Sequence, residues 1–292
     1  MPFVIAKPDL DTCLSALILG ADSTTVPLAV PGRAAPWMLA DPAYVCLECG
    51  GSGQMHLADF DHHDPARDLP PACRQALAAA GGGSPELVRL VDYVAEVDIP
   101  AWPRRSSRPK PSLSALFSGM LLRVGTPVGR FQAGLGLLET VRDLGLDPFE
   151  AMPVRPEWSD FLAARQAESE ALQRDAGGIV IRELPGGLRL GGLATRRYGA
   201  VGAIFSRGCR LAVALQPGRG EGEPAKATIA GAGLRVDWLL APLSDMEPGW
   251  GGRQDIIGSP VVGTRLPLGR LLDLVASQAG FTALMHAATP RI

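Results

Sequence analysis

The first hundred residues alternate short apolar runs with segments of helical spacing, and this alternation constrains the fold more than any other feature of the chain. Apolar runs of strand length cover residues 3–6, 25–29, 44–47 and 55–60. Apolar residues at helical spacing cover 12–19, 74–80 and 85–97. We predict an α/β fold, with a mostly parallel N-terminal sheet that has helices on both faces. Ligands of such sheets bind at the carboxyl ends of the strands.

Two adjacent histidines follow a carboxylate at the end of the fourth apolar run, as Asp61-His62-His63. The chain has only 4 histidines, so this tripeptide holds half of them. Imidazole together with carboxylate suits a borderline divalent ion such as Mn, Fe or Zn. A polar turn that closes the strand would explain the same residues without any ligand.

Two further acids, Asp9 and Asp11, stand between the first apolar run and the first predicted helix. Pro8 disfavours the helical conformation at Lys7 and therefore ends the strand. Capping of the helix N-terminus would account for one acid. Two acids separated by a single residue can instead hold two neighbouring cations.

These clusters resemble the motifs of the DHH phosphoesterase superfamily, in the order that the family has them. The matched residues are Asp9 and Asp11 in the first motif, Glu48 in the second, Asp61, His62 and His63 in the third, and Asp98 in the fourth. The resemblance implies a metal-dependent phosphoesterase acting on a nucleotide, a short oligonucleotide or a polyphosphate in a cleft between two domains. It makes His63 a contact of the scissile phosphate or a general acid, and it implies the metal ligands Asp9, Asp11, Glu48, Asp61, His62 and Asp98, with manganese as the expected ion.

Three positions depart from the family pattern. The family usually places a histidine shortly before the first aspartate, where this chain has Ile5 and Lys7. Glu48 replaces the usual aspartate, and Arg253 stands where the glycine-rich C-terminal loop often carries histidine. The Lys7 ammonium would neutralise Asp9 and contact a phosphate oxygen, as a compact cation can.

We therefore expect one divalent ion, with two possible, because the first-site histidine is missing. One ion is sufficient to polarise a phosphate and to lower the pKa of a bound water. The altered site would also fit a protein that has lost hydrolysis. The alternative function is a non-catalytic nucleotide- or anion-binding protein on the same scaffold.

The C-terminal part is similar to the DHH-associated domain DHHA1 through its glycine-rich loop. Gly251 and Gly252 would let the backbone approach a ligand, and Arg253 and Arg265 would bind its oxyanions. We predict a DHH-like metal-binding domain over 1–125, a helical connector over 126–177 and a smaller mixed α/β substrate-binding domain over 178–292. Expected helices of the later part cover 112–124, 135–144, 157–176 and 268–278, and expected strands cover 179–183, 188–193, 200–205, 210–215, 226–230 and 236–241.

Composition and sequence pattern limit the kinds of partner that the protein can bind and the cell compartment in which we expect it. A net charge of −2 argues against a footprint for long nucleic acid. No apolar run reaches about 18 residues, which predicts no membrane span. No leader is recognised, so we expect a cytoplasmic protein, with a homodimer as one option. The 5 cysteines lack framework spacing, and Cys46-x-x-Cys49 is either half of a zinc site or a pair of buried thiols. The basic segment 103–111 is either a solvated loop or a flap that holds a polyanion.

Overall fold

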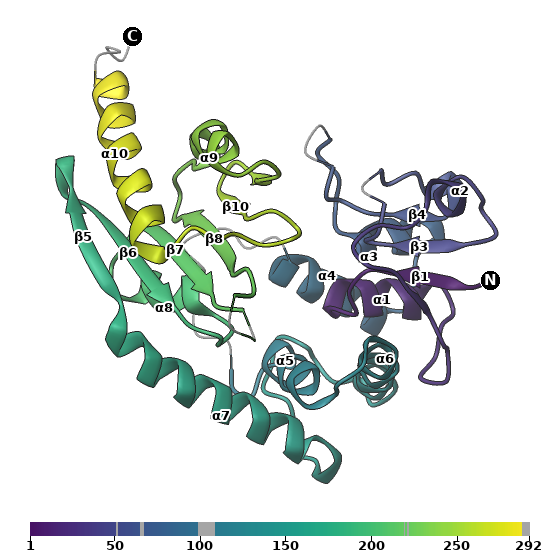
Figure 1. Cartoon of the computed structure of the whole chain (residues 1–292). Helices are drawn as coiled ribbons and strands as arrows, with labels where there is room; N and C mark the ends of the chain where they lie inside the picture. The colour runs from purple at the N-terminus through teal and green to yellow at the C-terminus, as the bar shows by residue number, and fades with distance from the viewer. Residues whose placement is uncertain (51, 65–66, 99–108, 219, 221, 288–292) are drawn as a thin grey trace. The chain divides into compact units, whose positions relative to one another are not determined.

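The computed structural model describes residues 1–50, 52–64, 67–98, 109–218, 220 and 222–287, with side chains described up to residue 279. The chain divides into two compact units, Met1–Gln166 and Ala167–Ile292. Figure 1 labels most of the helices and strands of each unit. The division falls within the long helix α7 (Ser159–Asp175). The predicted three-part boundaries stay a prediction.

The first unit contains a four-stranded sheet in which every pairing is parallel, as predicted. The strand order is β2-β1-β3-β4. The strands are β1 (Phe3–Ile5), β2 (Leu28–Ala29), β3 (Val45–Leu47) and β4 (Asp59–Phe60). Because neighbouring parallel strands run the same way, β1, β3 and β4 all end at one edge of the sheet.

In the part of the chain that the structure describes, two helices and a short 3-10 turn connect these strands, and four further helices lie between β4 and α7. They are α1 (Leu10–Ile18), α2 (Pro36–Leu39), η1 (Met55–Leu57), α3 (Ala72–Ala79), α4 (Pro85–Asp98), α5 (Leu113–Arg123) and α6 (Pro127–Asp143). Helix α6 begins eight residues before the predicted start at residue 135. Thr126 caps it by accepting the backbone N–H of Gly129 at 3.1 Å, and Pro127 is well suited to the first helical position.

Side chains of the sheet alternate between two apolar layers. Phe3 and Ile5 belong to the main core of the unit, which includes residues of α1, α3, α4, α5 and α6. Val4 and Cys46 face the other way, into a small cluster where Met38 and Leu39 of α2 pack. Helices therefore cover both faces of the sheet, as the alternation of the sequence predicted.

The second unit contains a six-stranded mixed sheet in the order β5-β6-β7-β8-β10-β9. Its elements are β5 (Val180–Leu184), β6 (Leu188–Ala194), α8 (Ala200–Ser206), β7 (Leu211–Gln216), β8 (Lys226–Gly231), η5 (Asp237–Leu239), α9 (Leu240–Met246), β9 (Gly251–Arg253), β10 (Ile256–Gly258) and α10 (Leu268–Ala287), with short 3-10 turns at η3 (Ala176–Gly178) and η4 (Pro185–Gly187). One sheet face packs on α10 through residues such as Leu271 and Val213, and the other packs on α8 through Ile204 and Ala212.

Three expected strand segments were wrong. Residues 200–205 form α8, residues 236–241 form η5 and the start of α9, and residues 55–57 form η1. Short apolar runs do not distinguish a strand from a buried helix by periodicity alone. For residues 200–205 the tertiary structure favours the helix, because β6 and β7 are parallel neighbours and need a crossover connection between them.

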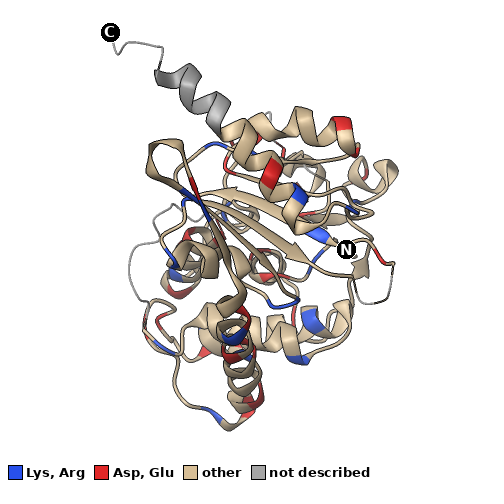
Figure 2. Cartoon of the chain, turned by 60° about the vertical axis from the view of Figure 1, so that its left-hand side comes forward, with Lys and Arg blue, Asp and Glu red and all other residues tan. Residues whose placement is uncertain are grey.

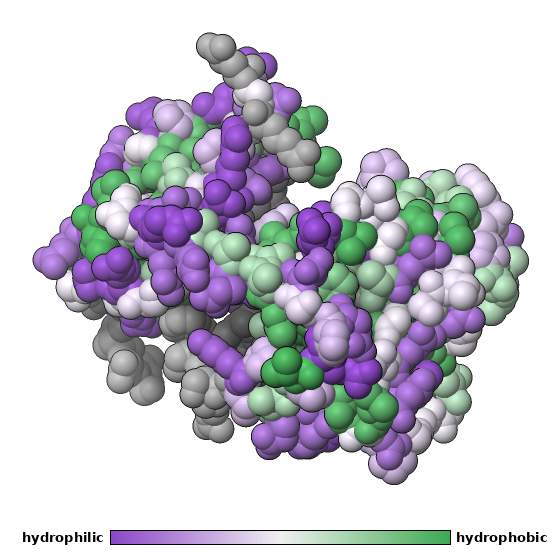
Figure 3. All heavy atoms as spheres, turned by 90° about the horizontal axis from the view of Figure 1, so that it is seen from below, coloured by the Kyte–Doolittle hydropathy of each residue, from purple (hydrophilic) through white to green (hydrophobic). Residues whose placement is uncertain are grey.

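Charged side chains are spread over both units without a single dominant sign. Figure 2 shows Lys, Arg, Asp and Glu mostly on helices and loops, while most of the strand area carries other residues. The face seen in Figure 3 mixes hydrophobic and hydrophilic residues. Within the described part of the chain, no helix combines the length and apolar character needed to cross a membrane.

Candidate metal centre

Polar side chains gather where β1, β3 and β4 end. Asp9 and Asp11 follow β1, Glu48 follows β3 directly, and the histidine pair follows β4. Because the carboxyl ends of parallel strands lie at the same edge, residues far apart in the sequence are brought together there.

Three of these side chains converge with Asp98, the last residue of α4, on one point. One potential ligand atom from each of Asp11, Glu48, His62 and Asp98 lies within 4.8 Å of all the others. The Nε2 atom of His62 lies 3.3 Å from Glu48 Oε1 and 3.1 Å from Asp98 Oδ2. The side chains of His62 and Glu48 are 5% and 4% exposed, so water contributes little to their solvation.

Asp11 is held in place by the start of α3. Its two carboxylate oxygens accept the backbone N–H groups of Ala72 and Cys73, both at 2.8 Å. Burial raises the pKa of Asp11 to about 7; the negative charge of Asp98 adds to this, while the hydrogen bonds from Cys73 oppose it. A nearby cation would favour the charged carboxylate.

Glu48 is presented by an unusual backbone conformation. Its φ is +48°, a value that few residues other than glycine adopt. The hydroxyl of Thr12 donates a 2.6 Å hydrogen bond to Glu48 Oε2. Burial and then the negative charges of Asp9 and Asp11 raise the pKa of Glu48 well above its ordinary value. Thr12 was not among the predicted site residues, since its role depends on a contact 36 positions away.

Asp61 holds the loop and the second histidine. Its Oδ2 accepts the backbone N–H of Gly50 at 3.0 Å. Its Oδ1 lies 2.9 Å from His63 Nδ1 and accepts the backbone N–H of His63 at 2.9 Å. Asp61 is absent from the converging ligand groups of the described residues, so its predicted role as a metal ligand stays a prediction.

His63 lies beside the cluster and reaches solvent. Its side chain is 63% exposed, and it forms a second converging group with Glu48 and His62. The hydrogen bond with Asp61 raises the pKa of His63, burial opposes it, and the charges of Asp61, Asp98 and Asp9 raise it further. An exposed imidazole at the edge of a buried cluster can contact a bound substrate.

Asp9 and Lys7 do not belong to the converging group of Asp11, Glu48, His62 and Asp98. Asp9 is the N-cap of α1, and its carboxylate accepts the backbone N–H of Thr12 at 3.0 Å. Lys7 is exposed, and among the described residues the structure records no ion pair for it. The capping interpretation of Asp9 therefore has direct support, while the pairing of Lys7 with Asp9 stays a prediction.

The remaining predicted residues lie in the second unit or outside the described part. Gly251, Gly252 and Arg253 form β9, and Arg253 Nε lies 3.7 Å from Asp255 Oδ1. Arg265 is exposed, and its backbone N–H donates to Glu247. Residues 103–108 of the basic segment lie outside the described residues. Cys46 and Cys49 are free and buried, as expected for the thiol interpretation.

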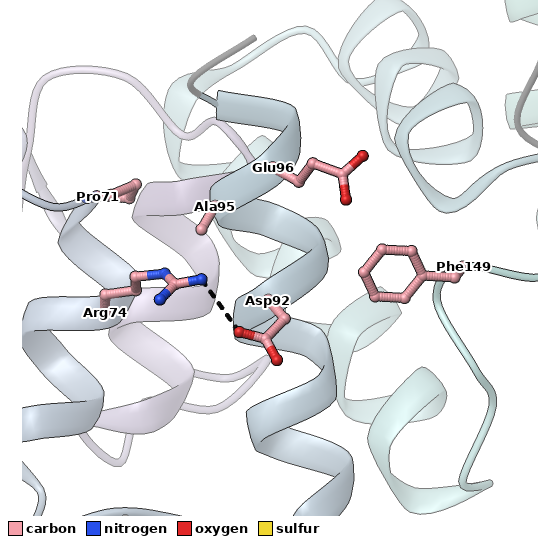
Figure 4. Close-up of a pocket in the computed structure, with 6 residues that line it drawn as sticks. All are labelled: Pro71, Arg74, Asp92, Ala95, Glu96 and Phe149. Carbon is pink, nitrogen blue, oxygen red and sulfur yellow. Dashed lines mark hydrogen bonds and ion pairs between the residues drawn. The ribbon is translucent and has the colours of Figure 1, made fainter. Parts of the chain in front are cut away.

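A cavity of about 450 Å³ is lined by residues at the start of α3, residues of α4 and Phe149 of the segment after α6 (Figure 4). None of its lining residues belongs to the two ligand groups; they are Pro71, Arg74, Asp92, Ala95, Glu96 and Phe149. Arg74 pairs with Asp92 at 3.1 Å, so its charge is already neutralised. The candidate metal centre is therefore identified by its converging ligand atoms and not by the size of a cavity.

The donor set of the convergent group fits a divalent cation. Three carboxylates and one imidazole are the ligands that Mn, Fe and related ions take in proteins. Burial, and then the negative charge of neighbouring carboxylates, raises the pKa of Asp11 and Glu48 and destabilises their charged forms. A cation at this point would reverse that repulsion.

Comparisons with known proteins bear on the fold. The chain matches no protein-family model and no curated protein at a significant level. Its structure is similar to that described as "pGpG-specific phosphodiesterase - PggH from Vibrio cholrae", with a TM-score of 0.55 and 11% identity over 99% of this chain and 100% of that chain. It is also similar to a DHH domain from a member of the s1p family of ribosomal proteins, with a TM-score of 0.50 and 12% identity over 96% of this chain and 86% of that chain.

Proposed function

We propose that this protein, whose chain has the fold of the DHH phosphoesterase superfamily, is a metal-dependent phosphoesterase of a small phosphorylated substrate. One observation carries the proposal. Asp11, Glu48, His62 and Asp98 come from four separate segments and place ligand atoms within 4.8 Å of one another. Collecting buried carboxylates in this way is unfavourable unless a cation binds among them.

We infer that these four residues hold one divalent ion, with Mn as the proposed metal. A bound ion would act as a Lewis acid on a phosphate oxygen and lower the pKa of a water molecule. Asp11 is oriented by α3 and Glu48 by Thr12, so both carboxylates are held before an ion arrives. Because the carboxylates are already oriented, less conformational entropy is lost when the ion binds.

His63 is the proposed contact for the substrate phosphate. Its Nδ1 faces Asp61 at 2.9 Å, which leaves Nε2 for a substrate oxygen. A protonated His63 would hold a phosphate oxygen or give a proton to the leaving oxygen. Asp61 favours that protonated form because it raises the pKa of His63.

The proposed substrates are short phosphorylated compounds. A net charge of −2 gives little attraction for long nucleic acid. The relative described as specific for pGpG makes a linear dinucleotide the first compound to test. Mononucleotides and polyphosphate are further candidates of the same chemical class, and Arg253 and Arg265 are proposed contacts for their oxyanions.

The test combines metal analysis with product detection. Protein purified without chelator should contain about one equivalent of a divalent ion, as the single ligand set predicts. Incubation with pGpG, mononucleotides or polyphosphate and Mn²⁺ should release product, and the His62→Ala variant should not. Metal binding without turnover of any compound would favour the alternative, a nucleotide- or anion-binding protein. Absence of metal binding under every loading condition would contradict both the ion and the catalytic proposal.

A further inference from the structure

A second concave site lies entirely within the C-terminal unit, at the edge where parallel strands β6 and β7 end. Its volume is about 180 Å³. It is lined by residues of the β6–α8 connection, the start of α8, the end of β7 and the start of β8, among them Arg197, Ala214, Gln216, Lys226 and Thr228. The carboxyl ends of parallel strands joined by a helix are a common place for ligands.

Sheet register puts the polar groups of β7 and β8 on one side. Ala214 is opposite Thr228, and Gln216 is opposite Lys226. Positions two apart on a strand share a face, so these four side chains point to the same side of the sheet. Ala214 is small and leaves space between the longer side chains around it.

The β6–α8 connection is held by partly buried hydrogen bonds. Thr195 donates to Asp175 at 2.5 Å and accepts the backbone N–H of Arg197. Glu168, whose side chain is 9% exposed, accepts the backbone N–H of Tyr198 and pairs with Arg197 Nη1 at 3.2 Å. Arg197 is therefore fixed in position before any ligand binds, while its side chain remains 46% exposed.

The lining contains two cations and no carboxylate. Lys226 Nζ donates to the carbonyl oxygens of Pro260 and Val261, and it has no carboxylate partner among the described residues. The side chains of Gln216 and Thr228 make no hydrogen bond within the described part of the chain. The charge of Arg197 is shared with Glu168, whereas the ammonium of Lys226 and the hydroxyl of Thr228 remain available to a ligand.

We propose that this site binds a phosphate group through Lys226, Arg197 and the hydroxyl of Thr228. Ammonium and guanidinium groups form charge-assisted hydrogen bonds with phosphate oxygens. Sites for whole drug-sized ligands usually measure roughly 300–1,000 Å³, so a volume of about 180 Å³ suits a phosphate better than an entire nucleotide. The group is either inorganic phosphate or the terminal phosphate of a larger ester whose remainder lies outside.

The test is phosphate binding to the full-length protein in chelator, so that it does not depend on the metal centre or on hydrolysis. Calorimetry with inorganic phosphate should detect binding to the wild type and to His62→Ala alike. Lys226→Gln should weaken binding about tenfold, as loss of a charge-assisted hydrogen bond does, and Thr228→Val by about three- to tenfold. Circular dichroism would verify that each variant is folded.

Arg270→Gln is the matched control, because it removes one exposed positive charge from the same unit outside the site. It should bind phosphate like the wild type. Equal weakening in Arg270→Gln and Lys226→Gln, undiminished binding in Lys226→Gln, or equally strong competition by acetate would each overturn the phosphate site. Competition by glycerol phosphate would identify a phosphate ester as the ligand, and its failure would identify the free ion.

Discussion

The two regions that the sequence singled out for ligand contact differ in how their charges are solvated. At the strand ends of the first unit, Glu48 and His62 are nearly buried and Asp11 is 2% exposed. In β9 of the second unit, Arg253 is half exposed and lies 3.7 Å from Asp255. Burying like charges destabilises a fold, whereas an exposed arginine has almost no energetic effect. Burial therefore makes the first region the stronger indication of a ligand.

The largest expected effect tests whether the buried cluster is a metal site. His62→Ala removes the imidazole that lies between Glu48 and Asp98. It should lower divalent-metal affinity by more than about a hundredfold, because loss of a residue that only orients a metal ligand already costs roughly 10–100-fold. Calorimetric titration with Mn²⁺ measures the change. Arg253→Ala is the control from the exposed region and should leave metal affinity unchanged. Equal losses in both variants would remove the distinction between the regions.

The second prediction concerns the stability of the metal-free protein against pH. Burial raises the pKa of Asp11 to about 7 in the folded state, above its ordinary value of 3.8. The folded protein therefore binds a proton more readily than the unfolded chain, and the free energy of unfolding should rise as pH falls from 7 to 5. One such group contributes at most about 1.4 kcal/mol per pH unit.

Urea unfolding at pH 5, 6, 7 and 8 in chelator measures this dependence. Metal-loaded protein is the control, and its stability should fall over the same interval because protons compete with the ion for Asp11. If the metal-free protein became less stable as the pH fell from 7 to 5, burial would not be raising the pKa of Asp11.

The third prediction tests the backbone of the second region. Gly252 has a φ of +144°, and a Cβ placed there would lie 2.4 Å from the carbonyl oxygen of Ile256. Gly252→Ala should lower the free energy of unfolding of this unit by about 1–3 kcal/mol. Gly251→Ala is a matched neighbour, since a Cβ there meets nothing within 4 Å, and it should change stability little. Denaturant unfolding compares the two, and equal stability of both variants would rule out a strained turn at Gly252.

The smallest effect concerns orientation within the metal centre. Thr12 donates a 2.6 Å hydrogen bond to Glu48 Oε2, so Thr12→Val should reduce metal affinity about tenfold while the fold is retained. Thr12→Ser keeps the hydroxyl and should restore most of that affinity. Mn²⁺ titration of both variants is the measurement. Equal metal affinity in Thr12→Ser and Thr12→Val would show that the hydrogen bond from Thr12 does not orient Glu48.

The sequence predicted the region of the metal centre because its signals are local. Strand-length apolar runs followed by Asp9, Glu48 or Asp61 indicate polar groups at strand ends, and parallel pairing then places these ends at one edge. The resemblance to the DHH superfamily was confirmed at the level of the fold. The structure decided two alternatives that the sequence left open: Cys46 and Cys49 are buried, and Asp9 is the acid that caps α1.

Tertiary structure decided which of the predicted residues converge and what the others do. Asp98 meets His62 only because α4 ends beside the sheet, and Asp61 accepts the backbone N–H of Gly50 through a contact that no spacing in the sequence reveals. Residues 200–205 became α8 for a similar reason: their apolar pattern fits either structure, and the crossover between parallel strands selected the helix. Local chemistry thus determined where polar groups occur along this chain, whereas burial and long-range packing determined which of them share one site, because only the folded chain brings distant segments within a few ångströms.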